Sequence, residues 1–345
     1  MRLRHRIALG LGLTAALAWP VAGAVPAAAA GTPLPAHVYA PYFETWTTDS
    51  IATIAQQSGA RYFTLAFIQT PKKGSCTPTW NGDATQTMAS GRYVADIAAL
   101  RSAGGDVIPS FGGFSADKGG TEIADSCADV SQIAAAYESV ITTYNVTRLD
   151  MDVEAKSLNN TAGIDRRNKA IAMVEAWAAS QGRTLQIQYT LPVEPYGLDP
   201  NGLAVLQNAI ANGTRVDSVN IMVFDYYLSG EGTVNMGAAA LSAAQNVHSQ
   251  LASIYPSATP AQLWAMEGMT MLPGIDDYPK KTEVTYLADA QTMLSSAQAN
   301  AMNFLSIWAI ERDNGGCPGT RDSNSCSGIV QNTWDFSHLL EPFTG

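Results

Sequence analysis

The chain has 345 residues, of which 46% are hydrophobic, and its formal net charge at pH 7 is -10. This length and apolar content suit one large domain with a substantial core. An acidic surface repels phosphate backbones and anionic lipid, which argues against nucleic acid and membranes as partners and is compatible with a neutral polymer.

The first thirty residues have the pattern of a secretory signal peptide. Arg2, Arg4 and Arg6 precede an apolar stretch over residues 7–19, and an alanine tract at 27–30 offers a cleavage site. A membrane anchor is the alternative, but the apolar run is too short to span a bilayer and prolines interrupt its flank. We therefore expect residues 1–30 to be a signal peptide, residues 31–345 to form the mature domain, and the protein to be secreted into the extracellular space.

After this segment, short apolar runs of β type alternate with alanine-rich amphipathic segments. The predicted strands are His37–Phe43, Tyr62–Gln69, Val107–Gly112, Leu149–Glu154, Leu185–Pro192, Ser218–Tyr226, Leu263–Thr270 and Phe304–Ile310. The predicted helices are Asp49–Ser58, Gly91–Ala103, Val130–Tyr144, Ile164–Ser180, Gly202–Asn212, Gly237–Ser253, Tyr286–Gln298 and Trp334–Leu340. This alternation predicts an α/β fold, and closure of eight such units gives a (β/α)8 TIM barrel.

An open doubly wound sheet remains an alternative, because periodicity does not report closure. No G-x-G-x-x-G follows a predicted strand, which disfavours the dinucleotide-binding version of that fold, and we expect no cofactor. No linker or compositional break divides residues 31–345, so a single domain is expected. About fifteen residues separate Thr270 from the next predicted helix, too few for a large insertion after the seventh strand.

The chain contains four cysteines: Cys76, Cys127, Cys317 and Cys326. In an exported protein the default is two disulfides, for which three pairings exist. We favour Cys76–Cys127 and Cys317–Cys326, because the second pair closes a short loop rich in Gly, Ser and Asn. A zinc site is the alternative, but neither a CxxC pair nor a nearby histidine supports it.

The most informative stretch is the fourth predicted strand, which reads L-D-M-D-V-E from position 149. Strand side chains alternate between faces, so Asp150, Asp152 and Glu154 share one face. In a barrel this face points inward, with Glu154 nearest the carboxyl end, where active sites form. A solvated edge strand is the structural alternative, but it conflicts with a central position in a β/α fold.

Three carboxylates inside a barrel are costly to bury and repel one another, so at least one should hold a proton near neutral pH. Glu154, the outermost, is placed to act as a general acid toward a leaving oxygen. Asp152 would stabilise developing positive charge. Asp150, the deepest, would share a proton with Asp152.

This strand also resembles a known signature. In the family-18 glycoside hydrolases, the chitinase family, strand four reads D-x-x-D-x-D-x-E, and residues 147–154 match its last three acids, with Thr147 in place of the leading Asp. S-F-G-G at 110–113 resembles the family's S-x-G-G on strand three, and residues 219–226 and 305–308 are similar to its sixth and eighth strands. The resemblance covers nearly the whole chain after residue 30 and implies a (β/α)8 barrel that hydrolyses chitin.

The resemblance implies a retaining, substrate-assisted mechanism, in which no enzyme carboxylate attacks the sugar. Glu154 would protonate the glycosidic oxygen while the substrate's own 2-acetamido carbonyl attacks the anomeric carbon. Asp152 would bind the acetamido N–H and stabilise the oxazolinium intermediate. Ser110 and Tyr42 would hydrogen-bond Asp150 and keep it oriented.

The resemblance also implies a wider set of substrate-binding residues. Trp308 would form the floor under the sugar at the scissile bond, with ordinary core packing as the alternative. Many relatives carry Tyr where Phe224 stands, so one hydrogen bond to the acetamide is either missing here or supplied by Tyr189 or Tyr226. The full set is Tyr42, Phe67, Ser110, Tyr189, Met222, Asp225, Tyr226 and Trp308.

Other functions remain open at this stage. A non-catalytic chitin-binding lectin of the same fold is disfavoured because such relatives typically lack the terminal Glu. A metal-dependent hydrolase is disfavoured because no histidine neighbours the acidic run, so no metal is expected. An endo-β-N-acetylglucosaminidase acting on glycoproteins would share the mechanism. We expect a monomer that cuts chitin or N-acetylglucosamine oligosaccharides internally in an open groove.

Overall fold

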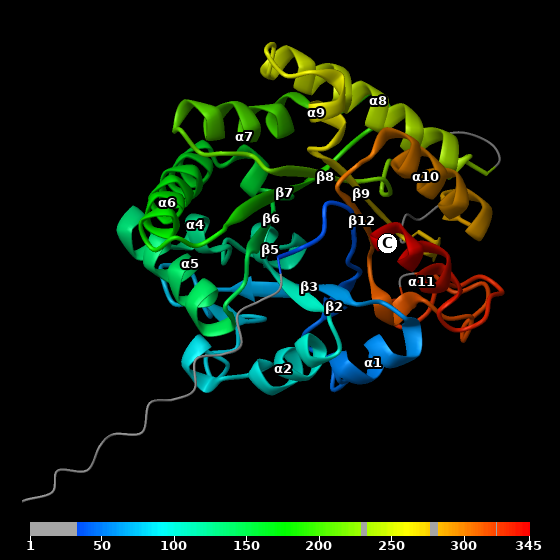
Figure 1. Cartoon of the computed structure of the whole chain (residues 1–345), viewed down its shortest axis with the longest axis horizontal. Coiled ribbons are helices and arrows are strands. Elements are labelled where there is room, and N and C mark those ends of the chain that lie inside the picture. Colours follow the sequence, from blue (N-terminus) through cyan, green and yellow to red (C-terminus); the bar gives the residue numbers. More distant parts are fainter. Residues whose placement is uncertain (1–32, 229–232, 277–281, 322) are drawn as a thin grey trace, which may run out of the picture.

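The computed structural model describes residues 33–228, 233–276, 282–321 and 323–345. The predicted signal peptide over residues 1–30 lies outside the described residues. Among the helices of the described segments, none is both long and apolar enough to cross a bilayer. These segments fold around one curled, mostly parallel sheet that is enclosed by helices (Figure 1).

The central sheet closes on itself through the first segment of the domain. Its hydrogen-bonded order is β1-β12-β9-β8-β7-β6-β5-β3-β2. Here β1 (Val38–Tyr39) pairs in parallel with β12 (Phe304–Ile307), and β2 (Tyr42–Glu44) pairs in parallel with β3 (Tyr62–Gln69). Because β1 and β2 follow each other directly in the chain, they join the two ends of the sheet and make it a barrel.

The remaining barrel strands run between β3 and β12 in chain order. They are β5 (Asp106–Gly112), β6 (Arg148–Asp152), β7 (Gln186–Pro192), β8 (Ser218–Met222) and β9 (Glu267–Met271). The short strand β4 (Thr79–Trp80) pairs antiparallel with β3 outside this path. The predicted (β/α)8 barrel and single domain are confirmed.

Helices form the outer layer around the barrel (Figure 1). The longer ones are α1 (Ile51–Ser58), α2 (Val94–Ser102), α5 (Val130–Tyr144), α6 (Thr161–Ser180), α7 (Pro200–Ala211), α8 (Met236–Ile254) and α10 (Leu287–Asn300). The shorter ones are α3 (Phe114–Gly119), α4 (Ile123–Ser126), α9 (Pro260–Trp264) and α11 (Asp335–Leu340).

Helix α5 shows how the local sequence determines where a helix begins, which face it buries and where it ends. The side chain of Asp129 accepts hydrogen bonds from the backbone N–H groups of Ser131 and Gln132 and so caps the first turn. Apolar residues then recur at helical spacing, and Ile133 and Tyr137 are buried against the barrel layer. Asn145, with φ +49°, adopts the left-handed conformation that ends the helix.

The two faces of strand β6 carry different kinds of side chain. Leu149 and Met151 are at most 1% exposed and belong to the apolar layer between barrel and helices. Burying each such side chain stabilises the fold by about 1.5–3 kcal/mol. Their neighbours Arg148, Asp150 and Asp152 lie on the other face, which is the barrel interior.

Several predicted boundaries differ from the structure. The seventh barrel strand begins at Glu267, not at Leu263, because Thr259 and Pro260 start helix α9 with a capping box and a proline in the first turn. The sixth ends at Met222, before Asp225 with φ +54°. The short helices α3 and α4 between β5 and α5 were not predicted.

The connection after the seventh barrel strand carries a small hairpin. Strands β10 (Gly274–Ile275) and β11 (Val284–Thr285) pair antiparallel there. Residues 277–281 of this connection lie outside the described residues. The length of the connection agrees with the prediction that no large domain is inserted at this point.

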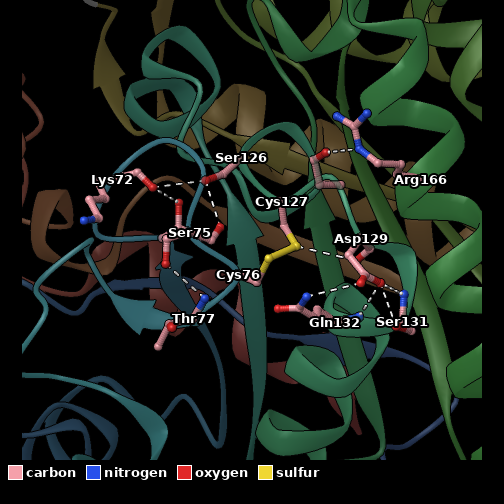
Figure 2. Close-up of a disulfide and its surroundings, with 12 residues drawn as sticks. Lys72, Ser75, Cys76, Thr77, Ser126, Cys127, Asp129, Ser131, Gln132 and Arg166 are labelled. Atoms are coloured by element: carbon pink, nitrogen blue, oxygen red, sulfur yellow. Dashed lines mark hydrogen bonds between the residues drawn. A yellow bond between two sulfur atoms is a disulfide. The ribbon is translucent and has the colours of Figure 1, made fainter.

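Both predicted disulfides are confirmed. Cys76–Cys127 joins positions 51 residues apart, with Cα atoms 4.8 Å from each other, and Cys317–Cys326 closes a loop of separation 9. Figure 2 shows the first of them, beside which Ser126 Oγ donates hydrogen bonds to the carbonyl oxygens of Lys72 and Ser75. This disulfide therefore anchors the end of α4 to the segment that follows β3.

Candidate active site

The predicted acids project from the fourth barrel strand toward its carboxyl end. In the parallel ladder Asp150 lies opposite Ser110 of β5, and Asp152 lies opposite Thr190 of β7. Side chains at paired positions point to the same side of a sheet, so these residues share the barrel interior. Glu154 follows two residues after the strand ends.

Asp150 is fully buried and richly hydrogen-bonded. In the described part of the chain, four side chains donate to it: Tyr42 Oη at 2.9 Å, Ser110 Oγ at 2.7 Å, Gln188 Nε2 at 3.0 Å and Thr190 Oγ1 at 2.6 Å. The contacts from Tyr42 and Ser110 are those that the resemblance implied. Burial raises the pKa of Asp150, while these four donors favour its ionised form.

Asp152 lies between Asp150 and Glu154 and has the more perturbed carboxyl. It is 3% exposed, and its Oδ1 has no hydrogen-bond partner among the described residues. Burial, followed by the neighbouring charges of Glu154, Asp150 and Asp117, raises the pKa of Asp152 well above its ordinary value. Asp152 therefore holds a proton more tightly than Asp150 does, as expected for crowded carboxyls.

A cleft of about 750 Å³ opens above the acids at the carboxyl end of the barrel. Asp152, Glu154 and Thr190 lie in its floor, so the acidic row reaches open space. The position matches the end of a (β/α)8 barrel at which active sites form.

One wall of the cleft is aromatic. Trp308 stacks on Phe67 with ring centroids 5.3 Å apart, and its edge meets Tyr42 at 5.4 Å. Trp46, which is 45% exposed, extends this wall with centroid distances of 6.5 Å to Phe67 and 6.3 Å to Trp308. Such a wall offers flat apolar faces against which a sugar ring can stack.

A second group of apolar lining residues comes from the ends of β8 and β9. Met222, Phe224 and Leu272 pack together there and reach Trp308. Asp225 also lines the cleft, and its backbone N–H donates to Asp276 Oδ2 at 3.0 Å. The hairpin β10–β11 thus fixes the loop that presents Asp225.

A family model for the glycosyl hydrolases family 18 matches residues 38–272, which include every strand from β1 to β9. The chain belongs to this family. The family-18 resemblance of the sequence is thereby confirmed.

Two curated relatives are similar over most of this chain. The probable bifunctional chitinase/lysozyme of Escherichia coli (strain K12) is 36% identical over 328 residues, which cover 91% of this chain and 36% of that protein. Endochitinase 11 of Metarhizium anisopliae is 35% identical over 294 residues, which cover 82% of this chain and 54% of that protein. This chain therefore spans only part of the length of either relative.

A solved structure resembles the whole barrel. The catalytic domain of the hyperthermophilic chitinase from Pyrococcus furiosus has a TM-score of 0.78 and 30% identity, and the match covers 91% of this chain and 96% of that domain. The two folds are therefore similar over most of both chains.

Two of the residues that family 18 suggested as substrate contacts lie elsewhere. Tyr189 is fully buried on the outer face of β7, where its hydroxyl donates to Asn168 Oδ1 of α6 at 2.7 Å. Tyr226 is 2% exposed and does not line the cleft, and burial followed by Glu283 raises its pKa. Neither hydroxyl therefore lies in the cleft, where the predicted contact with the substrate would require it.

Strand alternation explains the position of Tyr189, and the turn after β8 explains the position of Tyr226. Tyr189 shares its face with Ile187 and Leu191, the apolar side of β7, so its parity already pointed outward. Tyr226 lies between Asp225 and Tyr227, which both have positive φ, so no strand periodicity applies there. Tyr227, which is 57% exposed, lines the cleft instead.

The other predicted contacts fall into two groups. Tyr42, Phe67, Met222, Asp225 and Trp308 line the cleft, whereas Ser110 does not line it and instead donates a hydrogen bond to the buried Asp150. The lining residues that sequence analysis did not propose as contacts are Trp46, Gln69, Asn81, Phe114, Ser115, Ala155, Thr190, Pro192, Phe224, Tyr227, Thr270, Leu272 and Asn324. Within the described residues, no group of three or more His, Cys, Asp and Glu side chains could hold a metal ion.

Proposed function

We propose that this protein is a chitinase that hydrolyses β-1,4 linkages of N-acetylglucosamine polymers. The observation that carries the proposal is the row of acids on β6, which leads from the buried Asp150 to Glu154 in a cleft with an aromatic wall. The likeness to chitinases of known structure supports it, since family 18 membership alone fixes fold more firmly than substrate.

Glu154 acts as the general acid in this proposal. It lies in the cleft, where its carboxyl can donate a proton to the oxygen that leaves as the glycosidic bond breaks. The electrons that form the new bond to the anomeric carbon come from the carbonyl oxygen of the substrate's own acetamide. Water then opens the oxazolinium and returns a proton to Glu154, which restores the enzyme and retains the anomeric configuration.

Asp152 and Asp150 stabilise the charge that develops on the acetamide. The raised pKa of Asp152 favours its protonated form, beside an Asp150 whose negative charge four donors stabilise. Transfer of that proton toward Asp150 leaves Asp152 negative and able to accept the acetamido N–H. The negative charge then lies next to the cationic ring, in a site that excludes bulk water.

Aromatic stacking positions the sugar in the same proposal. Trp308, held by Phe67 and Tyr42, forms the surface under the sugar at the scissile bond. The connection after β9 carries a small hairpin in its described part and is too short to hold an inserted domain that would wall the cleft. An open cleft favours internal cuts in a soluble chain, so glycol chitin should be cut faster initially than crystalline chitin. Secretion and a monomeric state belong to the same proposal.

The proposal is tested by the requirement for the acetamide. Purified protein is incubated with N-acetylglucosamine oligosaccharides and with fully de-N-acetylated oligosaccharides of equal length, and the products are identified by mass. We expect cleavage of the acetylated series alone. The anomer formed first, read by proton NMR before mutarotation, should be β. Cleavage of the de-N-acetylated series at a similar rate, or an α product, would refute the mechanism.

A further inference from the structure

The position of Glu154 is fixed by a contact outside its own strand. The ladder of β6 ends near Val153, whose N–H donates to Thr190 O at 3.0 Å, and Ala155 has a left-handed φ of +44°. Between them, the N–H of Glu154 donates to Asp117 Oδ2 at 2.5 Å. A side chain from another element therefore holds the main chain of the proposed general acid.

Asp117 is built into this position by its surroundings. It lies in the short helix α3, is fully buried, and its own N–H donates to Gly113 O at 3.0 Å. A Cβ at Gly112 would lie 2.1 Å from Asp152 O and 3.3 Å from Asp117 Oδ1. Only glycine at position 112, with φ +103°, lets the end of β5 lie this close to the backbone of Asp152 and beside the Asp117 carboxyl.

A buried ion pair lies beside Asp117. Arg167 Nη2 of α6 contacts Glu122 Oε2 at 2.9 Å, and both side chains are 1% exposed. Burial, and then the charge of Glu122, raises the pKa of Asp117 well above its ordinary value, while Arg167 opposes this rise. Asp117 is thus one member of a buried cluster of ionisable side chains beside the end of β6.

The same segment holds the Glu154 turn at a second point. Asp125 of α4 accepts hydrogen bonds from Ser157 Oγ and from Asn160 Nδ2, the latter at 2.9 Å. The next residue but one is Cys127, which the disulfide ties to Cys76 (Figure 2). Residues 114–127 therefore form a support, anchored covalently at one end, for the turn that carries Glu154.

We propose that Asp117 is a positioning residue for Glu154: its carboxylate oxygen accepts the Glu154 N–H and so fixes the direction in which the Glu154 carboxyl enters the cleft. The inference rests on the proposed function, because it concerns the orientation of the side chain that acts as the general acid. Asp117 does not line the cleft and touches no substrate, so its loss should change the rate of the chemical step and leave substrate binding nearly unchanged.

Two variants of nearly equal shape separate the hydrogen bond from packing. Asp117→Asn keeps an oxygen that can accept from Glu154 N–H, whereas Asp117→Leu fills the same space without an acceptor. We expect Asp117→Leu to lower kcat on chitin oligosaccharides by about 10²-fold with KM within about threefold of wild type. Asp117→Asn should stay within about threefold of wild type in both constants. Asp117→Ala serves as the second acceptor-free variant if the leucine variant does not fold.

Asp313 provides a matched control elsewhere in the fold. It is also a buried aspartate that accepts backbone N–H groups, those of Phe336 and Ser337 in α11, and it does not line the cleft. Asp313→Leu should lower the melting temperature and leave kcat per folded molecule unchanged. Amide hydrogen exchange of the peptide that contains residues 153–158 gives a readout independent of turnover, and exchange should quicken in Asp117→Leu but not in Asp117→Asn.

The outcomes distinguish this inference from the proposed function. If the wild type cleaves chitin oligosaccharides but Asp117→Leu or Asp117→Ala has normal kcat per folded molecule, the positioning role is wrong and the proposed function stands. Equal loss of kcat in the asparagine and leucine variants would also overturn the role of the hydrogen bond. An inactive wild type would overturn both proposals together.

Discussion

The two faces of strand β6 differ in what their residues do. On the outer face, Leu149 and Met151 pack into the apolar layer between barrel and helices. On the inner face, Asp150 and Asp152 belong to a polar network that ends in the cleft. Alternating residues of one short strand thus serve stability on one side and chemistry on the other. Substitutions on the two faces should therefore have separable effects on unfolding and on turnover.

Glu154→Gln should produce the largest loss of turnover. The amide keeps the shape of the side chain but has no acidic proton to give to the leaving oxygen, so kcat on chitin oligosaccharides should fall about 10²–10⁴-fold. The free energy of unfolding should change by less than about 0.5 kcal/mol. Steady-state kinetics and urea unfolding check both parts, and unchanged turnover would remove Glu154 from the mechanism.

Trp308→Ala should have the next largest effect. Removing the indole deletes the stacking surface that Phe67 and Tyr42 support, a loss of about 1.5–3 kcal/mol or roughly 10–200-fold in kcat/KM. Trp264, which stacks on His248 with centroids 4.1 Å apart and does not line the cleft, is the matched control. Trp264→Ala should leave kcat/KM unchanged, and an equal loss in both variants would contradict the role of Trp308.

Met151→Ala tests the outer face of the same strand. Met151 is 1% exposed in the apolar layer, so its truncation should leave a cavity and lower the free energy of unfolding by about 2–5 kcal/mol. Turnover per folded molecule should stay within about twofold of wild type, because the inner face is not altered. A large fall in kcat with little loss of stability would show that the two faces are not separable.

Glu267→Gln should have no effect on turnover and should change only how stability depends on pH. Glu267 Oε1 lies 2.9 Å from His248 Nδ1. Burial raises the pKa of Glu267 to about 9 and lowers that of His248, so near pH 7 the pair is a neutral acid and a neutral imidazole.

The sign of this dependence follows from the raised pKa of Glu267. The folded protein keeps the proton to about pH 9, whereas the unfolded chain loses it near the ordinary glutamate pKa of 4.5. The wild type should therefore lose stability from this group as pH rises from 4.5 toward 9. Denaturant unfolding at several pH values should show a flatter profile for Glu267→Gln, and parallel profiles would contradict the assignment.

The inner and outer faces also differ in how far sequence could predict them. The alternation in L-D-M-D-V-E predicted both faces of β6, because strand periodicity is a local property. The same rule places Tyr189 on the outer face of β7 with Ile187. The family resemblance suggested a substrate contact for Tyr189 instead, and strand alternation was the better guide to its position. The number and order of strands favoured a barrel, but the division of the predicted strand His37–Phe43 into β1 and β2, which closes the sheet, was not predicted.

The irregular segments could not be predicted in the same way. Asp225 and Tyr227 have positive φ, so the side chains after β8 follow no period that sequence reveals. Asp117 lies in a short helix whose approach to Glu154 depends on the space left by Gly112 and on the charged cluster with Arg167. These are contacts between distant elements, and no local pattern encodes them.

The most direct test of Glu154 as the proton donor is to measure how the cleavage rate of the Glu154→Gln variant depends on the leaving group of the substrate. Aryl glycosides of N-acetylglucosamine oligosaccharides with a highly acidic phenol need no proton donor, whereas the natural sugar leaving group does. In single-turnover experiments we predict that release of the acidic phenol is nearly as fast in Glu154→Gln as in wild type, while oligosaccharide cleavage is lost. An equal loss on both substrates, or on neither, would contradict the assignment of Glu154 as the proton donor.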